Sequence, residues 1–241
     1  MIDTVIAFDL DDTLYKEADY VRSARREIAR RISRDYGARV PQLADPARMT
    51  DLMERYQLHG PGAFDALAAI LPPEVEQAIG SVYGMVRIYR SHTPDISLDD
   101  DTERVLGSLR DSGATLAIIT DGRIETQTIK VRALRLHRYV SPAMISVSEA
   151  VGSDKHSPLP FLRIMAMTPT ASRYIYVGDN LAKDFIWPNR LGWTSVCLAD
   201  TARVNISPQV IAPSPSYRPD AMPRHVITSL SSLPRIVHGA T

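Results

Sequence analysis

The stretch TVIAFDLDDTLY, residues 4–15, lies near the start of the chain and gives the first indication of its fold. The first half of the stretch is a short apolar run, which is typical of a buried strand. Asp9 and Asp11 follow at once, with Asp12 and Thr13 beyond them. We therefore expect a strand whose carboxyl end carries two acidic side chains. In an open α/β sheet, that end is where ligands bind.

The chain beyond residue 95 alternates short apolar runs with helix-like segments. Further strands are predicted at 115–119, 143–147, 174–177, 194–198 and 225–228. Short apolar strands that alternate with helices indicate an α/β fold, in which helices cover both faces of a mostly parallel sheet. A proline-rich stretch at about 203–224 is predicted to be an extended loop.

Residues 16–95 have a helical pattern throughout. Apolar side chains recur every four residues from Tyr20 to Tyr36, which predicts a helix that ends at Gly37. Further helices are expected at about 48–58, 63–71 and 74–90, with prolines between them. The sequence thus predicts two domains: a core of residues 1–15 and 96–241, and an all-helical insertion of residues 16–95.

Composition excludes several classes of protein. The 28 basic residues balance the 28 acidic ones, so no strong field of one sign favours nucleic acid or an anionic membrane. The single cysteine, Cys197, can form neither an internal disulfide nor a thiolate metal site. We find neither a membrane span nor a signal peptide, and we expect a cytoplasmic protein. The sequence leaves the oligomeric state open.

Polar residues also follow the other predicted strands. Thr120, Asp121 and Gly122 come after the second strand, while Gly178-Asp179-Asn180 ends the fourth, with Asp184 shortly beyond. Lys155 lies between these two groups in the sequence. Carboxylates that meet at one sheet edge repel one another unless cations neutralise them. Oxygen ligands without His or Cys point to Mg²⁺ as one of those cations.

Taken in order, these four groups resemble the motifs of the haloacid dehalogenase-like (HAD) superfamily. The helical insertion resembles the C1-type cap of its subfamily I. The resemblance implies a three-layer Rossmann-like core with the first strand at its centre, flanked by the strands that carry the second and fourth motifs. Because Asp11 is replaced in the metal-free dehalogenase branch and is present here, the chain is similar to the phosphatase branch.

The resemblance also implies a role for each motif residue. Asp9 would be the nucleophile that forms an aspartyl-phosphate, and Asp11 would be the general acid and base. We expect neighbouring carboxylates to raise the pKa of Asp11. Phosphoryl oxygens would be held by Thr120 and by backbone amides of Leu10, Asp11, Asp121 and Gly122. Lys155 would neutralise charge, and Mg²⁺ would be bound by Asp9, the Asp11 carbonyl and Asp179, with Asp184 acting through water or by positioning Lys155.

The predicted function is Mg²⁺-dependent hydrolysis of a small phosphorylated metabolite, with sugar phosphates and nucleotides as the classes considered. The alternatives are a phosphotransferase or mutase of the same fold, and a non-catalytic phosphate-binding regulatory protein. Arg123 is a candidate substrate contact at a helix start. The roles of His156, Tyr15 and the arginines of the first insertion helix stay open, although a solvated face is the favoured interpretation of those arginines.

Overall fold

The computed structural model describes residues 3–56, 62–202, 204–206, 209 and 219–239. The chain divides into two compact units, one of residues 1–16 and 97–241 and the other of residues 17–96. We describe each unit by itself and call them the core unit and the helical unit.

The core unit contains one parallel sheet with the strand order β3-β2-β1-β4-β5-β6. The strands are β1 (Thr4–Phe8), β2 (Thr115–Thr120), β3 (Ile145–Val147), β4 (Arg173–Gly178), β5 (Thr194–Leu198) and β6 (His225–Ile227). The first strand is central, between β2 and β4, so the predicted α/β fold and the predicted place of this strand are confirmed. The carboxyl ends of β1, β2 and β4 consequently lie next to one another.

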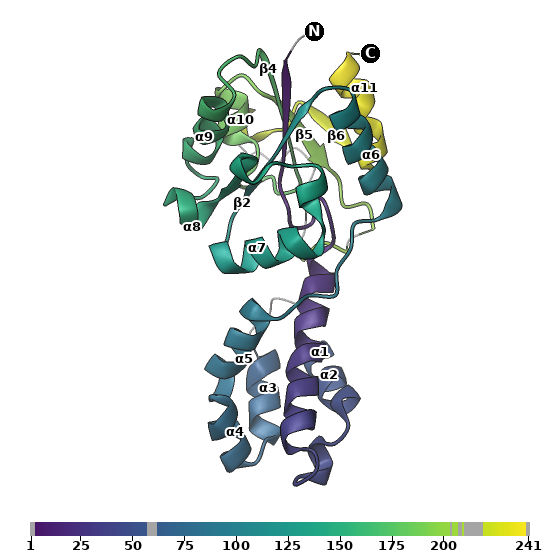
Figure 1. Ribbon diagram of the computed structural model, residues 1–241, viewed down its shortest axis with the longest axis vertical. Helices are drawn as coiled ribbons and strands as arrows, with labels where there is room; N and C mark the ends of the chain where they lie inside the picture. The colour runs from purple at the N-terminus through teal and green to yellow at the C-terminus, as the bar shows by residue number, and fades with distance from the viewer. Residues whose placement is uncertain (1–2, 57–61, 203, 207–208, 210–218, 240–241) are drawn as a thin grey trace. The chain divides into compact units, whose positions relative to one another are not determined.

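Helices cover both faces of the sheet (Figure 1). Helices α6 (Asp100–Asp111) and α11 (Leu233–His238) lie together on one side, and α9 (Leu159–Met167) and α10 (Ile186–Arg190) lie on the other. The remaining core helices are α7 (Ile124–Ala133) and α8 (Ser148–Val151). Single 3₁₀ turns lie at η2 (Leu136–Arg138), η3 (Pro142–Met144), η4 (Pro219–Ala221) and η5 (Leu230–Ser232). The strand predicted at 143–147 is shorter than expected because Pro142 starts one of these turns.

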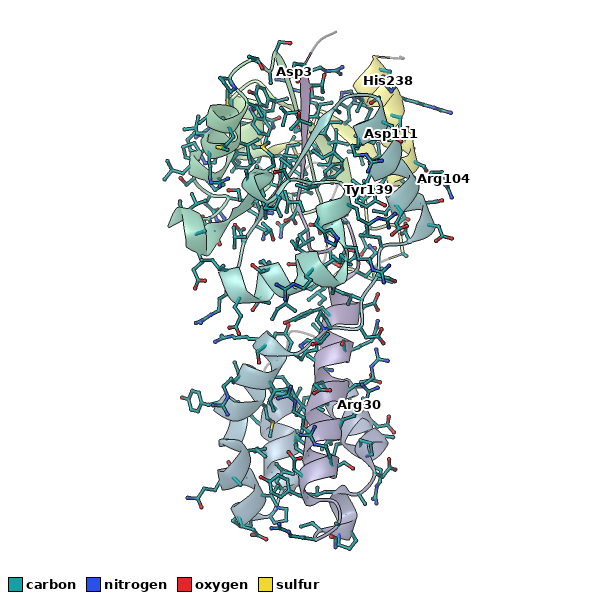
Figure 2. The ribbon with its side chains drawn as sticks, viewed as in Figure 1. Asp3, Arg30, Arg104, Asp111, Tyr139 and His238 are labelled. Carbon is teal, nitrogen blue, oxygen red and sulfur yellow. The ribbon has the colours of Figure 1, made fainter. Side chains whose placement is uncertain are left out.

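Burial explains why β1 forms so readily. All four residues from Val5 to Phe8 are fully buried, and the large side chains among them, Val5, Ile6 and Phe8, each contribute roughly 1.5–3 kcal/mol to stability. By contrast, α6 has an exposed face whose ion pairs, Arg104–Asp101 and Arg110–Asp111, are each worth about 0–1 kcal/mol. Figure 2 labels Arg104 and Asp111 on this helix. Asp99 is the N-cap of α6, since its side chain accepts the Thr102 N–H at 2.6 Å.

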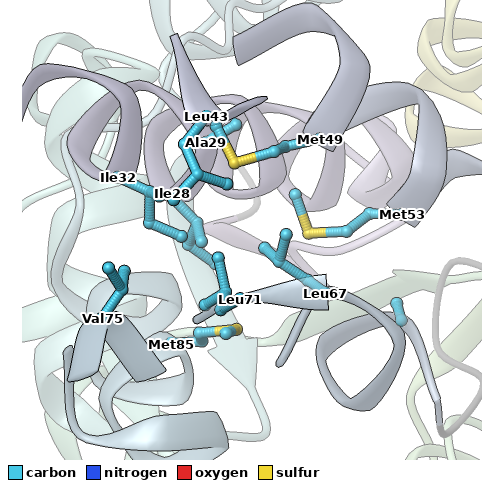
Figure 3. Close-up of a cluster of buried hydrophobic side chains, with 11 residues drawn as sticks. Ile28, Ala29, Ile32, Leu43, Met49, Met53, Leu67, Leu71, Val75 and Met85 are labelled. Atoms are coloured by element: carbon cyan, nitrogen blue, oxygen red, sulfur yellow. The ribbon is translucent and has the colours of Figure 1, made fainter. Parts of the chain in front are cut away.

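The helical unit packs around a core of apolar side chains (Figure 3). Its elements are α1 (Glu17–Tyr36), η1 (Pro41–Leu43), α2 (Pro46–Glu54), α3 (Ala63–Ile70), α4 (Pro73–Ile79) and α5 (Ser81–Ser91). On α1, Ile28 and Ile32 face this core, as the four-residue spacing predicts. The single helix predicted at 74–90 is wrong. Gly80, with φ of 80°, ends α4 in the left-handed region that favours glycine, and α5 begins after it.

The arginines of α1 do not all lie on a solvated face. Arg22 pairs with Asp19 and Arg31 with Glu27 near the surface, as that interpretation requires. Arg25 is different: it is buried and donates to the carbonyl oxygens of Met53 at 2.7 Å and Tyr56 at 3.3 Å. These carbonyls lie at the C-terminal end of α2, where the last carbonyl groups of a helix have no intrahelical N–H donors. Arg25 therefore has a structural role in joining α1 to α2.

None of the helices among the described residues is long and apolar enough to cross a membrane. Most of the loop predicted at 203–224 lies outside the described residues.

Candidate active site

The end of β1 brings Asp9 to the centre of the sheet edge. The Asp9 N–H still donates to the Val177 carbonyl of β4 at 2.8 Å, so the sheet holds this residue in place. The chain then turns sharply, because Asp12 has φ of 57° and the Leu14 N–H donates to the Leu10 carbonyl at 3.0 Å. Aspartate tolerates this left-handed conformation better than most residues do. The turn places Asp11 beside Tyr15, whose hydroxyl donates to Asp11 Oδ1.

Lys155 lies at the centre of a buried charge cluster. Its Nζ atom is 2.8 Å from Asp9 Oδ1 and 2.6 Å from Asp184 Oδ1, and its side chain is fully buried. Burial lowers the pKa of this amine, but Asp184 and Asp9 outweigh it and hold the pKa well above its ordinary value. Lys155 is therefore charged, and it joins two carboxylates that arrive from different strands.

Asp184 is held from both sides. Its Oδ2 atom accepts the N–H groups of Asp179 at 3.1 Å and Asn180 at 2.8 Å, while Tyr176 donates to Oδ1 at 3.2 Å. Backbone and side-chain donors thus occupy both oxygens of this carboxylate. Through Oδ1, Asp184 also contacts Lys155 Nζ at 2.6 Å, so it links the lysine to the end of β4.

Three carboxylates converge within reach of one cation. Oxygen atoms of Asp9, Asp179 and Asp184 all lie within 4.8 Å of one another, and all three side chains are buried. Burial and the neighbouring carboxylate Asp184 raise the pKa of Asp9 to about 7, although Lys155 opposes this. Burial, Asp9 and Asp184 raise the pKa of Asp179 to about 8. Full ionisation of the three carboxylates would therefore need a cation in addition to Lys155, and their oxygen ligands suit a hard divalent cation such as Mg²⁺.

The expected direction of the Asp11 pKa is wrong. Burial does raise it, but Lys130 Nζ lies 2.7 Å from Asp11 Oδ1 and, with hydrogen bonds from Tyr15 and Gln127, lowers the pKa below its ordinary value. The reason is geometric, since Asp11 points toward α7 and its lysine rather than into the carboxylate cluster. Asp11 therefore forms its ion pair with Lys130 and not with Lys155.

The sequence motifs did not identify Gln127 and Lys130 as residues of the site. Gln127 Nε2 donates to Asp11 Oδ2 at 3.1 Å, to Thr120 Oγ1 at 3.0 Å and to the Asp121 carbonyl at 2.6 Å. Both side chains are buried on α7. A signal did exist: they stand three residues apart, on one face of a helix that directly follows the second motif.

The residues predicted to hold phosphate occupy different environments. Thr120 and Leu10 are buried at the ends of β2 and β1. The Asp121 carboxylate accepts the Lys155 N–H at 3.1 Å and pairs with Lys183 at 3.2 Å. Gly122 does not offer a free amide here, since its N–H donates to Ser148 Oγ at 2.9 Å. Glycine is required there because φ is 141° and a Cβ would lie 2.9 Å from Gln127 Nε2.

Arg123 and His156 stay outside the buried cluster. Arg123 is exposed at the N-cap of α7, where its carbonyl accepts the Gln127 N–H at 3.0 Å. His156 is also exposed, with its ring Nδ1 3.4 Å from Asp154 Oδ2. Neither side chain contributes to the charge balance around Asp9.

A segment beyond β5 reaches the same sheet edge. Asn205 Nδ2 donates to Asp179 Oδ2 at 2.9 Å, and its Oδ1 accepts from Lys16 Nζ at 2.8 Å. Gln209 Nε2 donates to the Asp179 carbonyl at 2.8 Å. These amides orient Asp179 from the outer side of the cluster. Nothing in the local sequence pattern predicts them, because the contacts join residues far apart in the chain.

With this geometry established, the comparison with known proteins gives the family. The family model described as haloacid dehalogenase-like hydrolase matches residues 4–186, which includes all four groups of site residues. The chain belongs to this family, and it is a hydrolase. The resemblance stated from the motifs is thereby confirmed.

Curated relatives with phosphatase names match most of the chain. A glyceraldehyde 3-phosphate phosphatase from Methanopyrus kandleri is 27% identical over 200 residues, covering 79% of this chain and 82% of the relative. A ribulose-1,5-bisphosphate 5-phosphatase from Halopiger xanaduensis is 26% identical over 223 residues, covering 80% of this chain and 83% of the relative.

Solved structures share the fold. The HAD-hydrolase YfnB from Bacillus subtilis, described as bound to magnesium, matches with a TM-score of 0.60 at 17% identity, covering 98% of this chain and 99% of that one. A 2-haloacid dehalogenase from Pseudomonas syringae matches with a TM-score of 0.58 at 22% identity over the whole of both chains. At these identities the likeness concerns the fold alone.

Proposed function

We propose that this hydrolase is a Mg²⁺-dependent phosphomonoesterase that works through an aspartyl-phosphate on Asp9. One observation carries the proposal: Asp9 lies at the central strand end, in contact with Lys155 and close to Asp179 and Asp184. A nucleophilic carboxylate must be ionised and must approach a phosphate that is itself negative. Lys155 beside Asp9, together with a bound Mg²⁺, would meet both requirements.

The residues of the chain would divide the work as follows. Asp9 attacks phosphorus, and Lys155 neutralises charge on Asp9 and on the transferring group. Asp11 gives a proton to the leaving alkoxide and later takes one from water. Thr120 contacts a phosphoryl oxygen through its hydroxyl. Bound by Asp9, Asp179 and the Asp11 carbonyl, Mg²⁺ would supply further charge stabilisation for the transferring phosphoryl group.

The substrate class that we propose is a small phosphorylated sugar or sugar-derived metabolite. The names of the curated relatives support it, because glyceraldehyde 3-phosphate and ribulose 1,5-bisphosphate are both phosphate esters of short sugars. We propose further that residues 16–95 form the cap and select the leaving group. Such a cap excludes water from the reacting centre when it closes.

The test is phosphate release from a panel of sugar phosphates, sugar-acid phosphates and nucleotides, with Mg²⁺ and with a chelator. We expect turnover of sugar phosphates that the chelator abolishes. Asp9→Asn should lose activity by at least about 10³-fold, because no nucleophile remains. Asp101→Asn, which changes an exposed carboxylate on α6, is the matched control. Mass spectrometry after hydroxylamine treatment should locate the acyl-phosphate on Asp9.

Two results would overturn the proposal. One is full activity of Asp9→Asn, since the nucleophile would then be another group. The other is turnover that chelation leaves unchanged. An isomerised phosphate ester formed without free phosphate would favour the mutase alternative instead.

A further inference from the structure

Helix α7 buries two polar side chains that lie outside the four groups of motif residues. Gln127 and Lys130 are 2% and 3% exposed, whereas Arg132, on the same helix, is exposed. Burying an ammonium group costs several kcal/mol unless a partner compensates for the loss of water. For Lys130 that partner is Asp11, with Nζ and Oδ1 2.7 Å apart. The fold thus directs a second buried lysine at a second carboxylate of the site.

The donors divide unequally between the two oxygens of Asp11. Oδ1 accepts from Lys130 Nζ and from the Tyr15 hydroxyl. Oδ2 accepts from Gln127 Nε2 at 3.1 Å, a longer bond whose donor is shared with Thr120 Oγ1 and with the Asp121 carbonyl. Since Gln127 joins Oδ2 to Thr120, Oδ2 is the oxygen on the side of the proposed phosphate site. Oδ1 is turned toward the lysine.

We propose that Lys130 is a positioning residue. It holds the Asp11 carboxylate through Oδ1, so that Oδ2 is the oxygen that transfers a proton to the leaving group and accepts one from water. This inference rests on the proposed phosphatase function. Before the first half-reaction, Asp11 Oδ2 takes up a proton from water. Asp9 then forms a bond to phosphorus as the bond to the alcohol oxygen breaks, and that oxygen takes the proton from Asp11 Oδ2. In the second, a water oxygen forms the bond to phosphorus as the bond to Asp9 breaks, and one water proton returns to Oδ2.

The two buried lysines therefore have different tasks. Lys155 contacts the nucleophile Asp9 and acts on charge at the phosphoryl group. Lys130 contacts Asp11 and acts on the proton that the leaving group receives. A leaving group that departs readily without a proton should depend on Lys155 and hardly on Lys130. A leaving group that needs the proton should depend on both.

The experiment compares an alkyl phosphate, glycerol phosphate, with an aryl phosphate, 4-nitrophenyl phosphate, in the variant Lys130→Met. We expect kcat/KM for the alkyl ester to fall about 100-fold, the usual size of a general-acid contribution. For the aryl ester, kcat/KM should fall less than roughly fivefold, because it reports only steps up to release of the nitrophenol. The slowed second half-reaction should then appear as a pre-steady-state burst of nitrophenolate close to one equivalent of enzyme.

Controls separate this role from general damage to the fold. Arg132→Met removes an equal charge from the exposed face of α7 and should leave both substrates unaffected. Lys130→Arg keeps a cation beside Asp11 and should restore part of the alkyl activity. If Lys130→Met does not fold, Tyr15→Phe removes the other donor to Oδ1, and the same preference for the aryl ester is expected.

Equal losses on both esters with no burst, or no loss on either, would overturn the assignment of Lys130 while the phosphatase function stands. An inactive wild-type protein would overturn the proposed function, and this inference with it. The two failures are therefore distinguishable.

Discussion

A Cβ atom at Gly178 would lie 2.5 Å from Oδ2 of Asp184, closer than any real contact of this kind. The last residue of β4 must therefore be glycine, because the Asp184 carboxylate occupies the space that a side chain at position 178 would need. The same carboxylate holds Lys155 at 2.6 Å through its other oxygen. Lys155 can therefore lie beside Asp9 only because residue 178, at the end of β4, is a glycine without a side chain.

Gly178→Ala should displace Asp184 and, with it, Lys155. We expect kcat to fall at least about tenfold, because a small misplacement of a catalytic group is costly. Thermal stability should also fall, since the buried carboxylate loses backbone donors. Steady-state kinetics and thermal unfolding of the purified variant measure both effects.

Gly107→Ala is the matched control, because a Cβ at that position in α6 meets nothing within 4 Å. It should raise stability by about 0.5–1 kcal/mol and leave kcat unchanged. Unchanged kcat in Gly178→Ala would contradict the dependence of Lys155 on Gly178.

Lys155→Met should damage both stability and activity. The change leaves Asp9 and Asp184 buried without their shared cation, and removing one partner of a buried pair costs about 3–5 kcal/mol. Urea unfolding measures the loss of stability. The control is Lys183→Met, whose partly exposed side chain pairs with Asp121. Similar losses in the two variants would argue against a central place for Lys155.

The stability of the metal-free protein should fall as the pH rises. The pKa of Asp9 is about 7 and that of Asp179 about 8 in the folded protein, against 3.8 for the unfolded chain. The folded state therefore binds these protons more tightly, and this contribution to stability is lost as the pH rises from about 4 to about 8. Unfolding temperatures measured in the presence of a chelator across this pH range test whether stability falls as the pH rises.

Mg²⁺ should restore stability most at the upper end of that pH range, because the metal ion replaces the bound protons. Asp179→Asn, which removes one of the two carboxylates, should flatten the pH dependence. A stability that rises with pH in the chelator would mean that the carboxylate cluster is already neutralised by groups of the chain.

Asn205→Ala should weaken metal binding more than catalysis. Asn205 donates to Asp179 Oδ2, and donors that orient a metal ligand typically change metal affinity by about 10–100-fold when removed. We expect the Mg²⁺ concentration for half-maximal activity to rise about tenfold, with little change in kcat at saturation. Titration of activity with Mg²⁺ measures this. Thr201→Ala, an exposed position in the same connection, should leave the titration unchanged.

The sequence by itself determined the fold class and the residues that gather at one edge of the sheet, while the central place of the first strand followed from the family resemblance. Short apolar runs, the four-residue apolar spacing of the helices and the polar residues after each strand are local signals, and parallel strands must bring their carboxyl ends to one edge. Asp9, Lys155, Asp179 and Asp184 could therefore be grouped before any coordinates were known.

Only the tertiary structure decided how the charges pair. Asp11 was expected to share the field of the other carboxylates, yet it faces Lys130 and Gln127 on α7. Arg25 was expected in solvent and is buried against the end of α2. Coulomb interactions depend on distance and on burial, and both are set by packing between segments far apart in the chain. Motifs can name the residues of a site, but packing decides which carboxylate each cation faces.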